Sequence, residues 1–163
     1  EMRQENKMQM TNNDVLRRIR YTFDFNDDKM IEIFAQADLA ITREQLSNWL
    51  KKEEDDAYQV FTDVECATFL NGLINDRRGK KEGEQPKPEQ ELNNNIIFRK
   101  LKIALNLKDD DILNILVSVD FRLSRHELSA FFRKANHKNY RYCKDQILRN
   151  FLNGKQNKYR NIP

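Results

Sequence analysis

Apolar residues recur along this chain at intervals of three and four positions, with polar residues between them. The first such stripe lies within residues 13–23 and consists of Val15, Leu16, Ile19 and Phe23. Side chains at this spacing fall on one side of an α-helix, so the stripe predicts an amphipathic helix with a buried apolar face. Similar stripes continue towards the C-terminal end, and together they predict an all-α fold.

The pattern of apolar and polar residues occurs twice in the chain. Residues 12–72 align without a gap with residues 94–154, which lie 82 positions later. The identical pairs include Asn12/Asn94, Asn13/Asn95, Arg17/Arg99, Arg43/Arg125, Tyr58/Tyr140 and Asp63/Asp145. A gapless internal match of this length predicts two structurally equivalent halves, and we expect the shared tyrosines and aspartates to belong to the scaffold.

Each half divides into four helical segments. The second segment begins with adjacent aspartates in both halves, which suits the positive end of a helix dipole. The third begins at Thr42 or Ser124, and Gln45 or Glu127 follows three residues later. This is the spacing of a capping box, so the sequence predicts where these two helices start.

The fourth segment starts at Thr62 in the first half and at Lys144 in the second. Both copies then reach the sequence Phe-Leu-Asn-Gly, at Gly72 and Gly154. Glycine readily adopts the left-handed conformation that closes a helix, so we expect the helices to end there. Apolar residues follow Gly72, so the sequence leaves open that the fourth helix of the first half continues beyond this glycine.

The chain is organised as a first repeat at 10–76, a polar linker at 77–91 and a second repeat at 92–160. The linker has no apolar residue and contains two prolines and two glycines, so it adds nothing to a core. Residues 1–9 have no counterpart in the repeat, and Met10 is the expected native start.

A half of about 60 residues buries little apolar surface on its own. We therefore expect the two halves to pack against each other with an approximate two-fold relation. The predicted fold is all-α, with two tandem homologous four-helix units.

Several stretches resemble a known family. They are NNDVLRRIRYTFDFNDDKMIEIF, FLNGLINDRRGKKEG, NNNIIFRKLKIALNLKDDDIL and HKNYRYCKDQILRNFL. They are similar to the YehS-like bacterial proteins, which are defined by a domain of unknown function present twice per chain. The resemblance covers about residues 10–160, including the linker. It implies an all-helical cytoplasmic bacterial protein, and it carries no established activity and no catalytic residues.

Charge is divided unevenly between the halves. Residues 1–91 contain 14 Lys and Arg against 20 Asp and Glu, whereas residues 92–163 contain 15 against 6. The net charges are therefore −6 and +9. Such a division bears on partners, and it allows self-association of an acidic first half with a basic second half.

Membrane, metal and cofactor functions receive no support from the sequence. No stretch approaches the roughly 18 apolar residues that cross a bilayer, and no signal peptide is found, so we expect a cytoplasmic location. Cys66 and Cys143 lack metal-site spacing, and His126 and His137 have no cysteine pair nearby. We expect two reduced, buried thiols and no metal or cofactor.

One stretch, residues 137–145, invites a catalytic interpretation because it places His137, Tyr140, Cys143 and Asp145 close together. The aligned residues of the first half lack both the histidine and the cysteine. We therefore interpret the stretch as a structured loop in which the tyrosine packs and Asp145 helps to cap the last helix. No glycine-rich phosphate loop is present either, so we predict that the protein is not an enzyme.

A two-copy helical scaffold without catalytic groups favours a protein-interaction or regulatory module that presents grooves to a partner. The alternative is nucleic-acid binding, because the second and third segments of each half have the layout of a helix-turn-helix. The candidate contacts, to phosphate or to a partner, are Arg43, Lys51, Lys52, Arg125, Arg133, Lys134, Lys138 and Arg141. An acidic loop at 53–56 adjoins only the first set, so we expect the second repeat to dominate any such contact.

Overall fold

The structure, a computed structural model, describes residues 10–160, so the expectation for residues 1–9 lies outside the described residues. Eight α-helices form in this part of the chain, and it contains no strand, which confirms the all-α prediction. The first repeat holds α1 (Asn12–Phe23), α2 (Asp27–Gln36), α3 (Arg43–Leu50) and α4 (Asp63–Arg78). The second holds α5 (Asn94–Ala104), α6 (Asp109–Val117), α7 (Arg125–Ala130) and α8 (Asp145–Tyr159).

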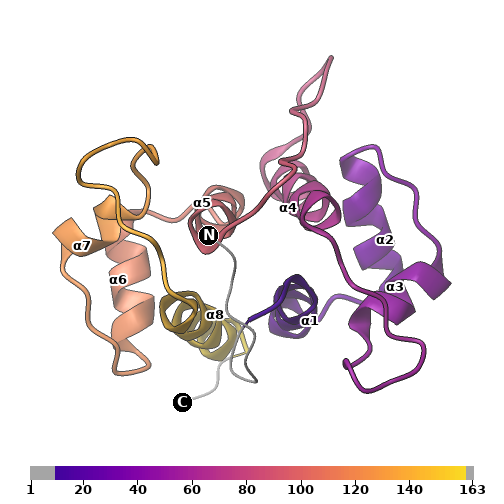
Figure 1. The fold of residues 1–163 in the computed structure, drawn as a ribbon, viewed down its shortest axis with the longest axis horizontal. Helices are drawn as coiled ribbons and strands as arrows, with labels where there is room; N and C mark the ends of the chain where they lie inside the picture. The colour runs from indigo at the N-terminus through magenta and orange to yellow at the C-terminus, as the bar shows by residue number, and fades with distance from the viewer. Residues whose placement is uncertain (1–9, 161–163) are drawn as a thin grey trace.

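Four helices form the centre of the molecule. α1, α4, α5 and α8 are seen end-on in Figure 1, with α2 and α3 on one side and α6 and α7 on the other. The repeats meet where α1 packs on α8 and where α4 packs on α5. Because α1 corresponds to α5 and α4 to α8, a shift of 82 residues converts one interface into the other. The predicted pseudo-two-fold relation is confirmed.

The central helices run in the same direction. The Met10 amide donates to Asp145 at 2.9 Å and Arg18 donates to Asn153, and both pairs are 135 residues apart, so α1 and α8 are parallel. The same contacts recur between α5 and α4, now 29 residues apart. They join the Leu92 amide to Asp63 at 2.9 Å and Lys100 to Asn71 at 2.6 Å.

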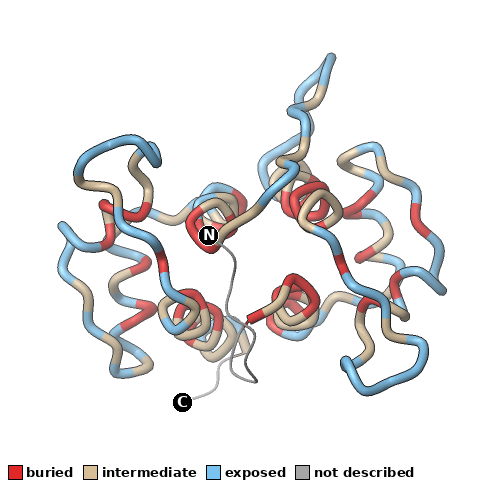
Figure 2. Tube along the Cα trace, in the orientation of Figure 1, coloured by how far each residue is buried: buried red, intermediate tan, exposed pale blue. Residues whose placement is uncertain are grey.

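One hydrophobic core runs through both repeats. Buried positions lie on the helix sides that face one another, whereas the connecting loops and the linker are largely exposed (Figure 2). The ring centroids of Phe34 and Phe69 are 5.0 Å apart in the first repeat, and those of Phe98 and Phe151 are 4.8 Å apart in the second. The expected packing of the two halves is therefore present.

The two glycines of the repeated Phe-Leu-Asn-Gly sequence are not helix ends. The predicted end is wrong for Gly154, and at Gly72 the longer helix that the sequence left open is the one that forms. α4 continues past Gly72 to Arg78, and α8 continues past Gly154. A Cβ atom on Gly72 would lie 2.0 Å from the carbonyl oxygen of Ile33, and one on Gly154 would lie 2.6 Å from that of Ile115. Glycine is required because α2 and α6 cross very close to α4 and α8 here.

Helix starts follow the sequence closely. Thr42 and Ser124 each form the expected capping box with the residue three positions on. The two third helices differ in length, since α7 ends at Ala130 with Phe131 as its cap. The left-handed glycine that closes α4 is Gly79, the residue where the linker begins to leave the helix.

Candidate functional site

The arginines of the third helices are engaged in ion pairs. Arg43 pairs with Asp28, and its copy Arg125 pairs with Asp110, so each third helix is tied to the start of the second. Both arginine side chains remain 60% exposed. α3 and α7 lie on opposite sides of the molecule (Figure 1), so the structure does not bring the two candidate helices together.

The remaining candidate contacts gather in the second repeat. In the first, Lys52 is exposed, and Lys51 is half-buried with its carbonyl accepting from Arg17 at 2.7 Å. In the second, the loop after α7 carries the exposed side chains of Lys134, Lys138 and Arg141, together with a half-buried Arg133. This loop is a local basic surface that has no equivalent in the acidic loop at 53–56.

The residues that suggested catalysis are not set up for it. Cys143 is fully buried, and burial, reinforced by the charge of Asp145, raises the pKa of its thiol to about 12. His137 is exposed, and its Nδ1 accepts from the Asn139 amide at 2.9 Å. A thiol that stays protonated at neutral pH is a poor nucleophile.

Both cysteines are free and buried, as the sequence predicts. Within residues 10–160, no three histidine, cysteine or acidic side chains are placed to share a metal ion. Among the same residues, no helix combines the length and the apolar character needed to cross a membrane.

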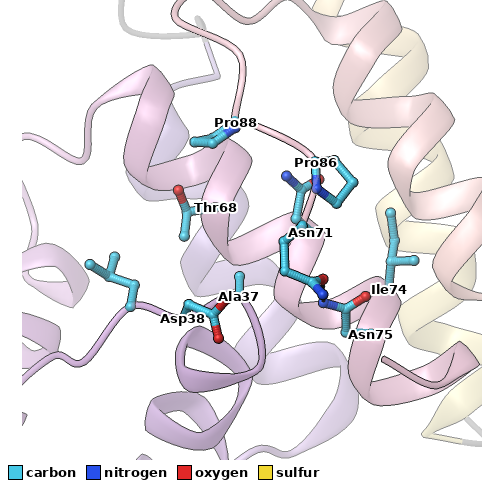
Figure 3. Close-up of a pocket in the computed structure, with 10 residues that line it drawn as sticks. Ala37, Asp38, Thr68, Asn71, Ile74, Asn75, Pro86 and Pro88 are labelled. Carbon is cyan, nitrogen blue, oxygen red and sulfur yellow. Dashed lines mark hydrogen bonds between the residues drawn. The ribbon is translucent and has the colours of Figure 1, made fainter. Parts of the chain in front are cut away.

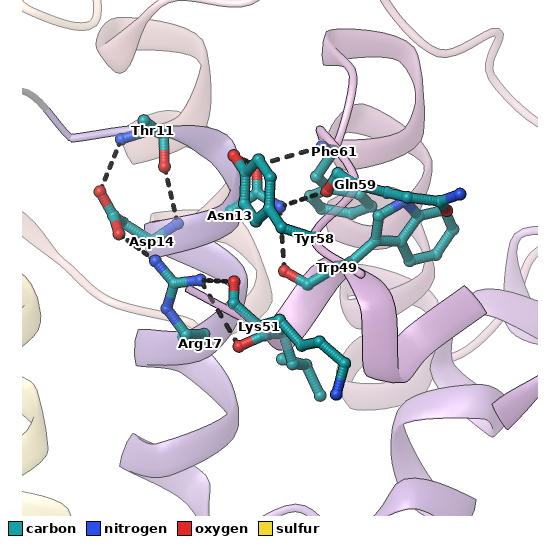
Figure 4. Close-up of polar contacts among 10 residues, drawn as sticks. Thr11, Asn13, Asp14, Arg17, Trp49, Lys51, Tyr58, Gln59 and Phe61 are labelled. Atoms are coloured by element: carbon teal, nitrogen blue, oxygen red, sulfur yellow. Dashed lines mark hydrogen bonds and ion pairs between the residues drawn. The ribbon is translucent and has the colours of Figure 1, made fainter. Parts of the chain in front are cut away.

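Asn13 anchors the long loop of the first repeat (Figure 4). Its side-chain amide donates to the carbonyls of Trp49 and Gln59, both at 2.9 Å. Its carbonyl accepts from the Phe61 amide and the Tyr58 hydroxyl, both at 3.1 Å. Every hydrogen-bonding group of this buried side chain therefore has a partner, and the expectation that Tyr58 belongs to the scaffold holds.

Asn95 repeats this arrangement in the second half. Its amide donates to the carbonyls of Phe131 at 3.1 Å and Arg141 at 2.7 Å, and its carbonyl accepts from the Cys143 amide at 2.9 Å. The basic loop after α7 is therefore held at both ends by one buried side chain.

Asp63 and Asp145 join elements within and between the repeats. Asp63 accepts from Asn12 at 2.7 Å, and Asp145 accepts from Asn94 at 2.5 Å. The other oxygen of each aspartate accepts the cross-repeat amide described above. The expected capping role of Asp145 is wrong, because Lys144 is the cap of α8 and no side chain bonds there. Asp145 instead accepts a hydrogen bond across the interface between the repeats.

The linker folds back over the first repeat and encloses a cavity of about 220 Å³ (Figure 3). Pro86 and Pro88 form one wall, and the side chains of α4 and the end of α2 form the other. Asn75 fastens the linker, since its amide donates to Gln85 at 3.0 Å and to the Gln36 carbonyl at 2.9 Å. The cavity therefore belongs to the first repeat, whose side chains line it together with the linker.

Two exposed apolar side chains occupy equivalent places just before α4 and α8. Val60 is 66% exposed and Tyr142 is 43% exposed. The next residue in each case, Phe61 or Cys143, is buried and bonded to a core asparagine. Because each exposed residue is followed directly by a buried and hydrogen-bonded one, the side chains of Val60 and Tyr142 face outward at the N-terminal end of the central helices.

The C-terminal ends of α1, α4 and α8 meet at the opposite end. Phe23 is buried at their junction, with the Tyr159 ring edge-on at 5.0 Å and the Arg77 guanidinium 5.5 Å from its centroid. The guanidinium of Arg160 lies 4.1 Å from the centroid of Tyr21. Such distances are typical of aromatic and cation–π contacts.

Two lysines of α8 complete this cluster. Burial, together with repulsion from Arg77 and Lys158, lowers the pKa of Lys155 below its ordinary value, against the attraction of Asp111. We name the cluster the cationic–aromatic end; it consists of Tyr21, Arg77, Lys155, Lys158, Tyr159 and Arg160. None of these six residues is among the eight basic candidate contacts named from the sequence.

The two repeats can now be compared with known proteins. A family described as "Protein of unknown function (DUF1456)" matches residues 12–79 and again residues 94–161. The uncharacterized protein YehS of Escherichia coli (strain K12) is 44% identical over 146 residues, which cover 89% of this chain and 94% of that protein. No solved structure matches significantly. The family resemblance inferred from the sequence is confirmed, and the chain belongs to the DUF1456 family, whose domain it contains twice.

Proposed function

We propose that this protein is a non-catalytic interaction module of the cytoplasm that binds a protein partner. The polar residues that both repeats keep support this reading, because Asn13, Asn95, Asp63 and Asp145 are all bonded within the scaffold. The thiol of Cys143, which lies in the stretch that suggested catalysis, is buried, and its raised pKa keeps it protonated at neutral pH. Because these residues serve the scaffold, the function proposed for this protein rests on its exposed side chains.

The observation that carries the proposal is the paired exposure of Val60 and Tyr142. An isolated exposed apolar residue is ordinary in proteins. Here, however, the fold fixes an apolar side chain outward at the same place in both repeats, where turning inward is prevented by a buried neighbour. Exposed aliphatic and aromatic side chains on a rigid support are suited to a protein interface.

Affinity capture from nuclease-treated lysate tests this function. The bait is the full chain, compared with the double variant Val60→Asp and Tyr142→Asp. The control is Val117→Asp, which changes a side chain that is 43% exposed on α6. We expect a specific partner to be recovered with the wild type and the control and lost with the double variant. Recovery of the same proteins by all three baits would contradict the proposal.

Nucleic-acid binding through the helix-turn-helix-like segments is the second candidate, and the basic loop after α7 favours it. Fluorescence anisotropy with labelled duplex DNA at several salt concentrations tests it. The variant Arg125→Glu, Arg133→Glu and Lys134→Glu should weaken binding and flatten the salt dependence, because fewer phosphates are neutralised. Binding that is unchanged in this variant would eliminate the second repeat as the contact.

A further inference from the structure

Positive charge gathers at the cationic–aromatic end. Among residues 10–160, no carboxylate forms an ion pair with Arg77, Lys155, Lys158 or Arg160. Other cations of this protein do form ion pairs, including Arg20 with Asp27 at 2.5 Å and Lys102 with Asp109 at 2.8 Å. The basic loop after α7 also carries cations that form no ion pair with a described carboxylate, so the feature that sets this end apart is the aromatic rings among its cations.

A comparison with the first repeat explains where the surplus comes from. In that repeat Lys29 of α2 pairs with Asp76 of α4 at 2.8 Å. At the equivalent positions the second repeat has Asp111 on α6 and Lys158 on α8, with the charges exchanged. Among the residues that the structure describes, these two side chains do not form an ion pair with each other. α8 thus presents a lysine to the surface where α4 presents a paired aspartate.

The helix dipole does not account for the whole cluster. Basic residues in a last helical turn stabilise the dipole, which suffices for Arg77 and Lys158. Lys155 differs, because it is half-buried among other cations, and its equivalent in the first repeat is the fully buried Leu73. The second repeat therefore has a charged lysine at a position where the first repeat has a buried leucine.

Aromatic rings lie among these cations. Tyr21 is 52% exposed and Tyr159 is 51% exposed, and the buried ring of Phe23 supports Tyr159 from below. The equivalent of Tyr21 in the second repeat is Ile103, so an aromatic ring at this position occurs in the first repeat alone. Exposed rings beside unpaired cations are the combination that binds bases and phosphates together.

We propose that the cationic–aromatic end binds single-stranded nucleic acid, with Arg77, Lys158 and Arg160 on the phosphates and bases stacked on Tyr21 and Tyr159. A single strand is favoured over a duplex because bases must be unstacked to reach a flat aromatic surface. The inference goes beyond the function proposed above and is independent of it, since Val60 and Tyr142 lie at the other end of the parallel helices.

The test measures fluorescence anisotropy of the full chain with a short labelled strand of mixed sequence, as DNA and as RNA, and with the matching duplex. Polyglutamate serves as the acidic-peptide probe. We expect both single strands to bind more tightly than the duplex and than polyglutamate, with affinity falling as salt rises. A clear preference between the two strands identifies the natural ligand as RNA or as DNA.

Two pairs of variants locate the contact. Tyr21→Ala with Tyr159→Ala should weaken single-strand binding roughly tenfold or more, whereas Tyr21→Phe with Tyr159→Phe should retain it. The matched control Ile103→Ala removes an equally exposed side chain from the other repeat and should leave binding unchanged. Circular dichroism and thermal unfolding confirm that each variant is folded.

Charge changes test the phosphate contacts, and circular dichroism again checks the fold because Arg160 also contacts the Tyr21 ring. Lys158→Glu with Arg160→Glu should weaken binding and reduce the slope of log affinity against log salt by roughly 1.4, which corresponds to two phosphate contacts. Lys87→Glu with Lys144→Glu, at exposed lysines of the linker and of the start of α8, should have little effect.

Four results would overturn the proposal. They are the absence of single-strand binding at low salt, tighter binding of the duplex, and affinity that is unchanged by both the tyrosine and the charge variants. The fourth is polyglutamate binding that depends on the cations but not on the tyrosines, which would identify an acidic protein as the ligand.

Discussion

The two repeats are alike where their side chains bond to the backbone inside the molecule and unlike where their helices end at the surface. Asn13 and Asn95 each hold the loop before the fourth helix, with matching partners. By contrast, the exposed Tyr21 of the first repeat corresponds to the exposed Ile103 of the second. Buried hydrogen bonds tolerate little change because a lost partner leaves a desolvated polar group. Surface positions carry no such penalty and are free to differ.

The two repeats also differ in how their charges are paired and in whether the linker covers their fourth helix. The first repeat pairs its charges across α2 and α4 and covers α4 with the linker, whereas the second leaves lysines unneutralised on α8. Charge pairing and linker contacts are therefore distributed unequally between the two repeats. Changes at equivalent positions should reveal that inequality.

The largest expected effect is at the close helix crossings. Gly72→Ala should destabilise the protein by about 3 kcal/mol, because the new methyl group meets the Ile33 carbonyl and overpacks the α2–α4 contact. Gly154→Ala should cost about 2 kcal/mol, since its Cβ has slightly more room. Urea unfolding measures both. Equal stability of the two variants would show that the crossings relax to the same extent.

The next effect concerns the buried asparagines. Asn13→Ala should cost about 2 kcal/mol and Asn95→Ala about 1 kcal/mol, because the first loses the additional bond to the Tyr58 hydroxyl. Tyr58→Phe is the control, since it removes that bond alone and should account for the difference. If Tyr58→Phe has no effect on the free energy of unfolding, the inequality has another origin.

Replacing Lys155 with its counterpart should stabilise the fold. We expect Lys155→Leu to raise the free energy of unfolding by about 1 kcal/mol at neutral pH and to weaken single-strand binding. The folded pKa of Lys155 is lowered, so its penalty is present at neutral pH and shrinks as the pH rises through that lowered pKa. The gain of the variant should therefore decrease at alkaline pH. A gain that is constant with pH would assign it to packing alone.

The smallest effect has the opposite pH dependence. Hydrogen bonds to Asp76 and then Glu32 raise the pKa of Lys29, so the stabilisation is present at neutral pH and is lost as the pH rises through the raised pKa. Lys29→Met should cost about 0.5 kcal/mol, because solvent screens a partly exposed pair. Thermal unfolding at neutral and alkaline pH measures this cost, and Lys29→Arg should preserve stability at both.

Much of the fold could be predicted because its signals are local or repeated. A capping box is contained within four residues, so Thr42 and Ser124 could be placed from the sequence. The gapless repeat predicted two equivalent units. The predicted helix end at Gly154 was wrong and the one at Gly72 was left open, because a glycine near the end of an apolar stripe suits both a helix end and a close crossing. Only the position of the neighbouring helix distinguishes the two.

The candidate site was harder to predict. Tyr21, Arg77 and Lys155 are separated widely in sequence, and they converge only because the central helices are parallel. One signal was present in the alignment of the repeats, where Lys155 stands opposite Leu73. The ion pairs of Arg43 and Arg125 could also have been suspected, since each arginine and its aspartate partner recur in both copies.

The bond between the Met10 amide and Asp145 has a consequence for synthesis on the ribosome. α1 is the first described helix to be translated, yet it packs on α8, the last described helix. The side of α1 that faces α8 is therefore covered only after α8 has been made, by contacts that are 135 residues apart in sequence. Distant contacts of this kind slow folding and prolong the exposure of apolar surface.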